Sequence, residues 1–121
     1  IMSIDFLHTV IGNDGLVAST ALAKELHITK SDLAEVTGLS IDSISKTVRL
    51  KSKATQARLL DTVEIIDRLS EWSGNVGRAF AWFRSQPLHS FGDKTAEDLV
   101  KEGRAKAVKD YLFRIADGGY A

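Results

Sequence analysis

Cysteine is absent from the 121 residues, and proline occurs only once. Without cysteine there is no disulfide framework, thiolate metal site or cysteine nucleophile, and this composition suits a reducing cytoplasm, where we expect the protein to reside. No apolar run approaches the ~18 residues that a membrane span needs. The first residues do not form a basic segment followed by an apolar stretch, so no signal peptide is expected. The 16 Lys+Arg balance the 16 Asp+Glu, which excludes a uniformly basic surface but permits a local basic patch.

Groupings of side chains that carry catalysis are also scarce. The three histidines are His8, His27 and His89, and no two of them have the i, i+3 or i, i+4 spacing of a helical metal pair. Neither a nucleophile elbow nor a phosphate-binding glycine loop is present. The acids are interleaved with bases, as on a solvated helix surface. We therefore expect no catalytic residue, no metal, no cofactor and no enzymatic activity.

Helical periodicity of apolar residues extends over most of the chain, and no long segment alternates with period two. This pattern predicts an all-α fold. Residues 4–19 are read as a short helix or strand next to a turn at residues 13–15, with helix favoured. Further helices are expected over residues 20–28, 31–37, 41–50, 54–72, 76–85, 95–101 and 104–117. Val48, Ala57 and Leu60 are expected to face inward from two of them.

The segment Ser31–Ser45 has the spacing of a helix–turn–helix. Ala34 is small where two helices would cross, and Gly38 permits the positive φ of the turn. Ser40 is placed to cap the second helix, while Ile44 is among the residues that would fill the space between the two. The segment resembles the helix–turn–helix of Xre/Cro-like repressors.

In such a motif the second helix enters the major groove of DNA. The candidate DNA-binding residues are Ser40, Ile41, Asp42, Ser43, Ser45, Lys46, Arg49 and Lys51. This set reads bases poorly, because Asp42 repels phosphates and no Arg, Asn or Gln stands early in the helix for a bidentate contact. Residues 46–58 contain basic residues but no acidic one. Binding of DNA phosphates there would depend on the salt concentration, and a homodimer would strengthen it by doubling the positive charge. The alternative is a helical hairpin that serves packing or protein contact.

The C-terminal half has its own pattern. Its aromatic residues at helical spacing are most simply core, while Trp82 beside Arg84 is also a combination that protein interfaces favour. Tyr120 follows two glycines near the end of the sequence. The full set is Ala81, Trp82, Pro87, Leu88, Phe91, Gly92, Thr95, Asp98, Leu99, Val100, Gly103, Ala107, Val108, Tyr111, Leu112, Ile115 and Gly118–Ala121. In order and spacing it resembles the toxin-binding domain of Xre/MbcA/ParS-type antitoxins, over about residues 58–121.

This resemblance implies an N-terminal helix–turn–helix region (1–57) packed with a small helical toxin-binding domain (58–121). It implies a type II antitoxin that is a homodimer, occludes a RES-type NAD-degrading toxin, and autoregulates its operon by binding operator DNA. The implied toxin-binding residues are Trp82, Arg84, Lys109, Arg114, Gly119, Tyr120 and Ala121. Family members often have proline where this chain has Ala96, and a basic pair where it has Ser43, Ser45 and Lys46. The alternative function is an Xre-class DNA-binding regulator whose C-terminal half only dimerises.

Overall fold

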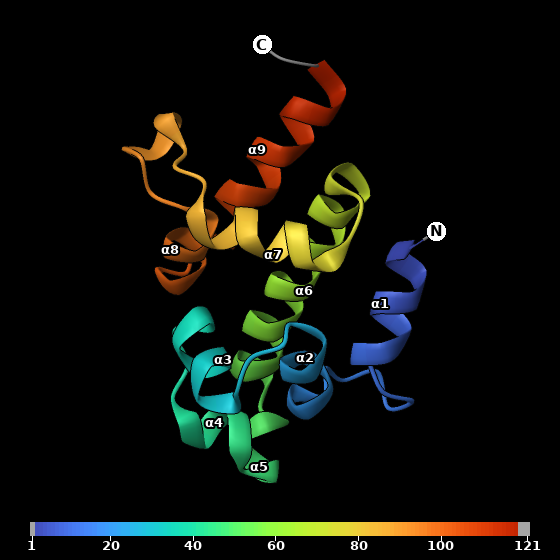
Figure 1. Cartoon of the computed structure of the whole chain (residues 1–121). Helices are drawn as coiled ribbons and strands as arrows, with labels where there is room; N and C mark the ends of the chain where they lie inside the picture. The colour runs from blue at the N-terminus through green and yellow to red at the C-terminus, as the bar shows by residue number, and fades with distance from the viewer. Residues whose placement is uncertain (1, 119–121) are drawn as a thin grey trace.

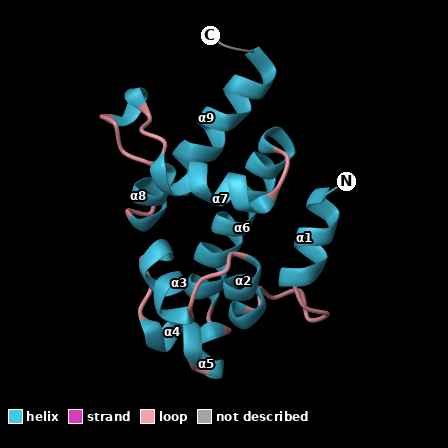
Figure 2. Cartoon of the chain, viewed as in Figure 1, coloured by secondary structure: helices cyan, strands magenta, loops and turns pink. Residues whose placement is uncertain are grey.

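The computed structural model describes residues 2–118 of the chain, and the side chains of residues 5–116. Over residues 2–118 it is all-helical, which confirms the predicted fold class (Figures 1 and 2). Two isolated antiparallel bridges, Ile11 to Val17 and Leu88 to Lys94, close two loops. The helices are α1 (Met2–Val10), α2 (Ser19–Glu25), α3 (Lys30–Thr37), α4 (Ile41–Ser45), α5 (Thr47–Leu50), α6 (Lys53–Ser73), α7 (Val76–Ser85), the 3-10 helix η1 (His89–Phe91), α8 (Ala96–Lys101) and α9 (Ala105–Gly118).

The long helix α6 runs through the centre of the molecule (Figure 1). Helices α1, α3, α5, α7, α8 and α9 all contact it. Its buried side chains are Thr55, Leu59, Thr62, Val63, Ile65, Ile66, Leu69 and Ser70. Each fully buried Leu, Ile or Val side chain contributes about 1.5–3 kcal/mol to folding. The apolar residues of this set belong to one continuous core that also includes residues of α2, α3 and α4, so α6 joins the two halves of the chain.

Helix ends in the N-terminal half lie where the sequence predicts them. Thr29 caps α3 through a capping box with Asp32, in which each side chain accepts a hydrogen bond from the other residue's backbone N–H. Gly38 ends α3 in the left-handed conformation, with φ of 72°. Ser40 caps α4 by accepting a hydrogen bond from the N–H of Ser43. The helix–hairpin geometry around Gly38 is therefore defined by local side-chain chemistry.

The expected helix over residues 41–50 is wrong in its extent. Lys46 is extended, with φ of −92° and ψ of 125°, and it separates α4 from α5. The segment is rich in serine and β-branched residues, which stabilise a helix weakly. As a consequence Val48, which we expected to face inward, is 85% exposed. Ala57 and Leu60 are also exposed, because the apolar face of α6 is centred on Leu59 and Val63 instead.

The C-terminal half follows its predicted boundaries closely. Helix α7 spans Val76–Ser85 and ends just before Gln86–Pro87, as expected. A loop then leads to α8, where Thr95 and Asp98 form a second capping box. In this loop the ring of Phe91 meets Tyr111 of α9 edge-on, with the ring centroids 6.1 Å apart. The loop is thereby packed against the last helix.

The position of Gly38 leads to a stability prediction. A Cβ added there would lie 3.2 Å from the Cα of Lys101 in α8, whereas a Cβ at Gly92 would have no heavy atom within 4 Å. Both glycines have positive φ, so alanine at either position pays a backbone cost of about 1–2 kcal/mol. We expect Gly38→Ala to lower the free energy of unfolding by about 1 kcal/mol more than Gly92→Ala, as measured by urea denaturation. Equal losses for the two variants would contradict close packing of α3 on α8.

Candidate functional site

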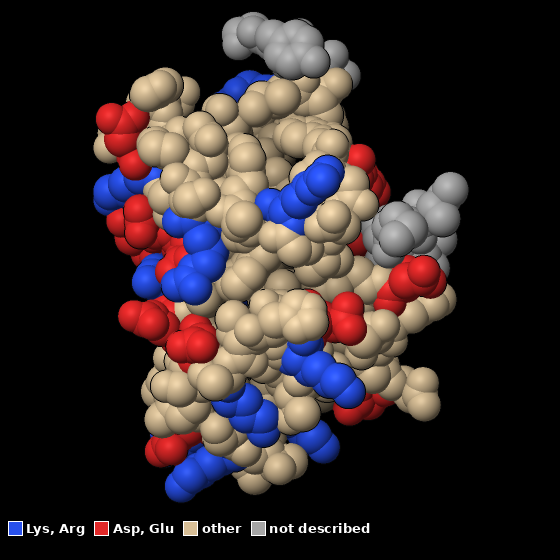
Figure 3. Space-filling model, in the orientation of Figure 1, with Lys and Arg blue, Asp and Glu red and all other residues tan. Residues whose placement is uncertain are grey.

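Basic side chains gather at the end of the molecule formed by α4, α5 and the start of α6. We call Lys46, Arg49, Lys51 and Lys53 the basic tip; all four residues are exposed. The tip lies at the end of the molecule opposite the C-terminal end of α9 (Figure 1). Figure 3 shows Lys and Arg side chains exposed at this lower end. Because an anion binds best where several cations converge, the tip is a candidate phosphate-binding surface.

The structure brings the candidate DNA-binding residues together at this tip. Six of them are exposed, while Asp42 and Ser43 are half-buried. Several of their polar groups bind one another: Ser40 Oγ donates to Ser43 Oγ at 2.9 Å, and Asp42 Oδ2 lies 3.7 Å from Arg49 Nη1. The ion pair with Arg49 partly neutralises the carboxylate of Asp42, which we expected to repel DNA phosphates. It also links α4 to α5 across the extended Lys46.

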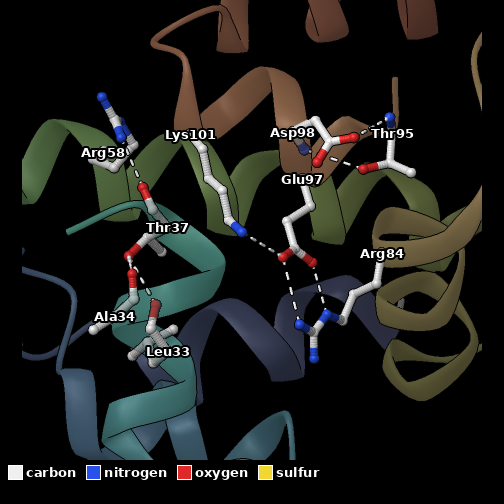
Figure 4. A network of polar contacts seen from close by, with 9 residues as sticks. All are labelled: Leu33, Ala34, Thr37, Arg58, Arg84, Thr95, Glu97, Asp98 and Lys101. Atoms are coloured by element: carbon white, nitrogen blue, oxygen red, sulfur yellow. Dashed lines mark hydrogen bonds and ion pairs between the residues drawn. The ribbon is translucent and has the colours of Figure 1, made fainter. Parts of the chain in front are cut away.

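The C-terminal half meets α3 at a polar network drawn in Figure 4. At its centre Glu97 is only 7% exposed. Its carboxylate accepts hydrogen bonds from Arg84 Nε at 2.7 Å and Nη2 at 3.4 Å, and it lies 3.1 Å from Lys101 Nζ. The hydrogen bond to Glu97 raises the pKa of Arg84 above its ordinary value, against the opposing effect of burial. Arg84, expected on the toxin-binding surface, therefore also ties α7 to α8.

A second contact of this network joins α3 to α6. Arg58 Nη1 of α6 donates to the backbone carbonyl of Thr37 at 2.7 Å, at the end of α3 (Figure 4). The last carbonyls of a helix have no partner within the helix, and a cation there also interacts favourably with the helix dipole. This contact therefore stabilises the end of α3 just before the Gly38 turn.

Lys109, another residue expected to bind the toxin, has partners within the chain. Its ammonium group donates to Asp61 Oδ1 at 2.7 Å and to Glu64 Oε1 at 2.6 Å, both on α6. Burial alone would lower the pKa of Lys109, but the hydrogen bonds to the two carboxylates outweigh it and raise the pKa. The structure thus places Lys109 in the α6–α9 contact, with its side chain about one-third exposed.

The remaining expected toxin-binding residues differ in exposure. Trp82 is half-buried against the core, and Arg114 is exposed on α9. Gly119, Tyr120 and Ala121 lie outside the described residues. Sequence reasoning missed Phe113, which is 61% exposed on α9. A helical wheel could have found it, because Phe113 falls beside the exposed Lys106–Asp110 pair and away from the inward stripe of Val108 and Leu112.

One cleft of about 580 Å³ lies between α1, α6 and α9. Apolar side chains of Leu7, Ile65 and Leu112 line it together with Glu64, Asp67 and Glu71. Burial and the nearby charge of Glu71 raise the pKa of Asp67. Within the described part of the chain no three His, Cys, Asp or Glu residues converge on a point where a metal could bind. Nor does any described helix combine the length and apolarity that crossing a membrane requires.

Comparison with known proteins identifies the fold. No protein-family model matches the sequence, and no curated protein does so either. Among solved structures, the chain is similar to a chain of the crystal structure of the M. tuberculosis MbcT–MbcA toxin–antitoxin complex. The two share 19% sequence identity with a TM-score of 0.62, over 86% of this chain and 95% of that chain. The fold of this protein is therefore one that occurs in a toxin–antitoxin complex.

Proposed function

We propose that this chain is the antitoxin of a type II toxin–antitoxin pair, which binds and occludes a RES-type NAD-degrading toxin and represses its own operon through the basic tip. The observation that carries this proposal is the fold likeness to a chain of the MbcT–MbcA complex, which extends over 86% of the chain. The resemblance of residues 58–121 to antitoxin toxin-binding domains supports the same function independently of the fold. In this proposal the protein has no catalytic role of its own.

The toxin-binding surface is assigned to the second region, residues 58–121. Phe113 and Arg114 are exposed on α9, the helix that leads to Gly119–Ala121. Exposed aromatic and arginine side chains are the residue types that most often anchor a protein interface. The aromatic side chain of Tyr120 suits a mostly apolar, nucleotide-sized pocket. In this proposal the tail, Gly119–Ala121, would occlude the toxin by filling its substrate pocket.

The DNA-binding surface is assigned to the first region, residues 1–57, where the four cations of the basic tip are exposed. Four phosphate contacts from one copy would bind DNA weakly at physiological salt. A homodimer would double the number of contacts and match a two-fold symmetric operator. Because the tip and the end of α9 lie at opposite ends of the molecule, one copy could hold toxin and DNA together (Figure 1).

The alternative function is an Xre-class DNA-binding regulator in which the C-terminal half only dimerises. One observation favours it: the charged groups of Arg84 and Lys109 bind carboxylates within the chain instead of standing free for a partner. In that case the chain would bind DNA and leave any RES-type toxin active.

The toxin-binding surface is tested by Phe113→Ala and by deletion of Tyr120–Ala121. We expect each change to weaken binding to a RES-type toxin of the same genome by at least about tenfold, since buried aromatic anchors contribute more than about 1.4 kcal/mol. The measurement is isothermal titration calorimetry with purified toxin. Because Phe113 is 61% exposed, the melting temperature of Phe113→Ala should be unchanged. Val48→Thr, at the opposite end of the molecule, is the control, and unaltered affinity in both test variants would contradict the assigned surface.

The basic tip is tested by the double variant Lys46→Ala, Arg49→Ala. If both side chains contact phosphates, DNA affinity should fall and the slope of log K against log[salt] should become less steep by about 1.8, from ~0.9 for each contact. Fluorescence anisotropy at several salt concentrations measures this slope. Lys106→Ala removes an exposed charge from α9 and serves as the matched control. Toxin affinity should stay unchanged; a parallel loss of toxin binding would mean that the two surfaces are not separate.

A further inference from the structure

Two large apolar side chains stand exposed beside the basic tip. Val48 of α5 is 85% exposed, the highest value among the large hydrophobic residues that the structure describes. Ile41, the first residue of α4, is 46% exposed. Both residues are β-branched, so their methyl groups are held in few rotamers. Exposing two such side chains costs free energy unless another molecule covers them.

The two residues lie on α4 and α5, which contact each other. Ile41 immediately precedes Asp42, and Val48 immediately precedes Arg49. The ion pair of Asp42 with Arg49, at 3.7 Å, joins α4 to α5 at this place. Each apolar residue is therefore one position away from the contact that connects the two helices. The four cations of the basic tip lie close to these residues in the sequence. Asp42 is the one acidic residue among residues 40–53, and it is already paired with Arg49.

Few polar groups remain at this surface to distinguish one base from another. Bidentate base contacts are made mainly by Arg, Lys, Asn and Gln. Residues 40–51 contain no Asn or Gln, and their one Arg, Arg49, is paired with Asp42. The hydroxyls of Ser40 and Ser43 bond to each other at 2.9 Å. The lysines are point charges that suit phosphates. The exposed hydroxyl residues Ser45 and Thr47 can contact a base edge, but Ile41 and Val48 are the exposed apolar residues of this segment.

We infer that Ile41 and Val48 read the 5-methyl group of pyrimidines in the major groove, so that this antitoxin prefers operator positions occupied by thymine. The inference rests on the DNA binding proposed above. The thymine methyl is the one apolar group that a base edge presents in the major groove. Removing one methyl-sized group from water favours binding by about fourfold. The positive charge of the tip favours DNA over a protein of mixed charge as the molecule that covers these side chains.

The test uses four DNA duplexes of equal length and no assumed operator. One contains only A·T pairs in mixed order, and its partner has uracil in place of every thymine. Another contains only G·C pairs, and its partner has 5-methylcytosine in place of every cytosine. Each comparison adds or removes the same major-groove methyl in a different base context, so agreement between the two excludes an effect of DNA shape alone. Binding is measured by fluorescence anisotropy at low salt.

We expect the wild-type protein to bind the methylated member of each pair about fourfold more tightly or better. Val48→Thr replaces one methyl by a hydroxyl at nearly constant shape and should reduce both ratios. The double variant Ile41→Ser, Val48→Ser, which leaves no side-chain methyl at either position, should bring both ratios close to one while leaving the salt dependence unchanged, because no cation is removed. Phe113→Ala, which removes an exposed apolar side chain from the other end of the molecule, should keep the wild-type ratios.

The possible outcomes separate the two proposals. Equal binding of methylated and unmethylated duplexes by the wild-type protein would overturn the inference and leave DNA binding intact. Ratios above one that persist unchanged in the Ile41→Ser, Val48→Ser double variant would also overturn it, since other groups would then sense the methyl. No binding to any of the four duplexes would overturn DNA binding itself. Loss of toxin affinity in Val48→Thr, without any change in the DNA ratios, would assign this surface to the protein partner instead.

Discussion

The buried face of α6 is the surface on which both ends of the molecule depend. Helices of the N-terminal half pack on it together with α7, α8 and α9, and the core it organises is continuous. The basic tip begins at the N-terminal end of α6, while Lys109 of α9 binds Asp61 and Glu64 farther along the same helix. A helix of 21 residues spans about 30 Å. It can therefore hold two surfaces at a fixed separation, as the proposed binding of both toxin and DNA requires.

The junction around Glu97 and Gly38 gives the two halves a second connection. Glu97 binds cations from α7 and α8, and Gly38 brings the end of α3 against the backbone of Lys101. A nearly buried carboxylate that lost its partners would be costly, so this contact resists separation of the halves. Arg84, a cation expected to bind a partner protein, is thus used within the fold. For this reason the proposed toxin contacts rest on exposed side chains of α9 and on the tail.

Much of the fold could be predicted because it is encoded locally. The cap at Ser40 and the turn at Gly38 depend on residues within four positions of one another, and both are confirmed. The break at Lys46 was not predicted, because weak helix propensity does not by itself say where a helix divides. The partners of Arg84 and Lys109 lie 13 to 48 residues away, so sequence spacing could not reveal that these charges are used internally. The exposure of Phe113 was not predicted either, although the position of this residue on a helical wheel of α9 indicates that it faces solvent.

The most direct test of the proposed function is co-expression of this chain with a RES-type toxin of the same genome. Cell growth and the NAD⁺ content are measured with toxin alone and with both proteins, and the lysate is passed over an affinity column for the tagged antitoxin. The account predicts restored growth, preserved NAD⁺ and co-elution of the two proteins in a defined ratio. Depleted NAD⁺ with no co-elution, although the antitoxin is soluble and folded, would contradict the account and favour a DNA-binding regulator.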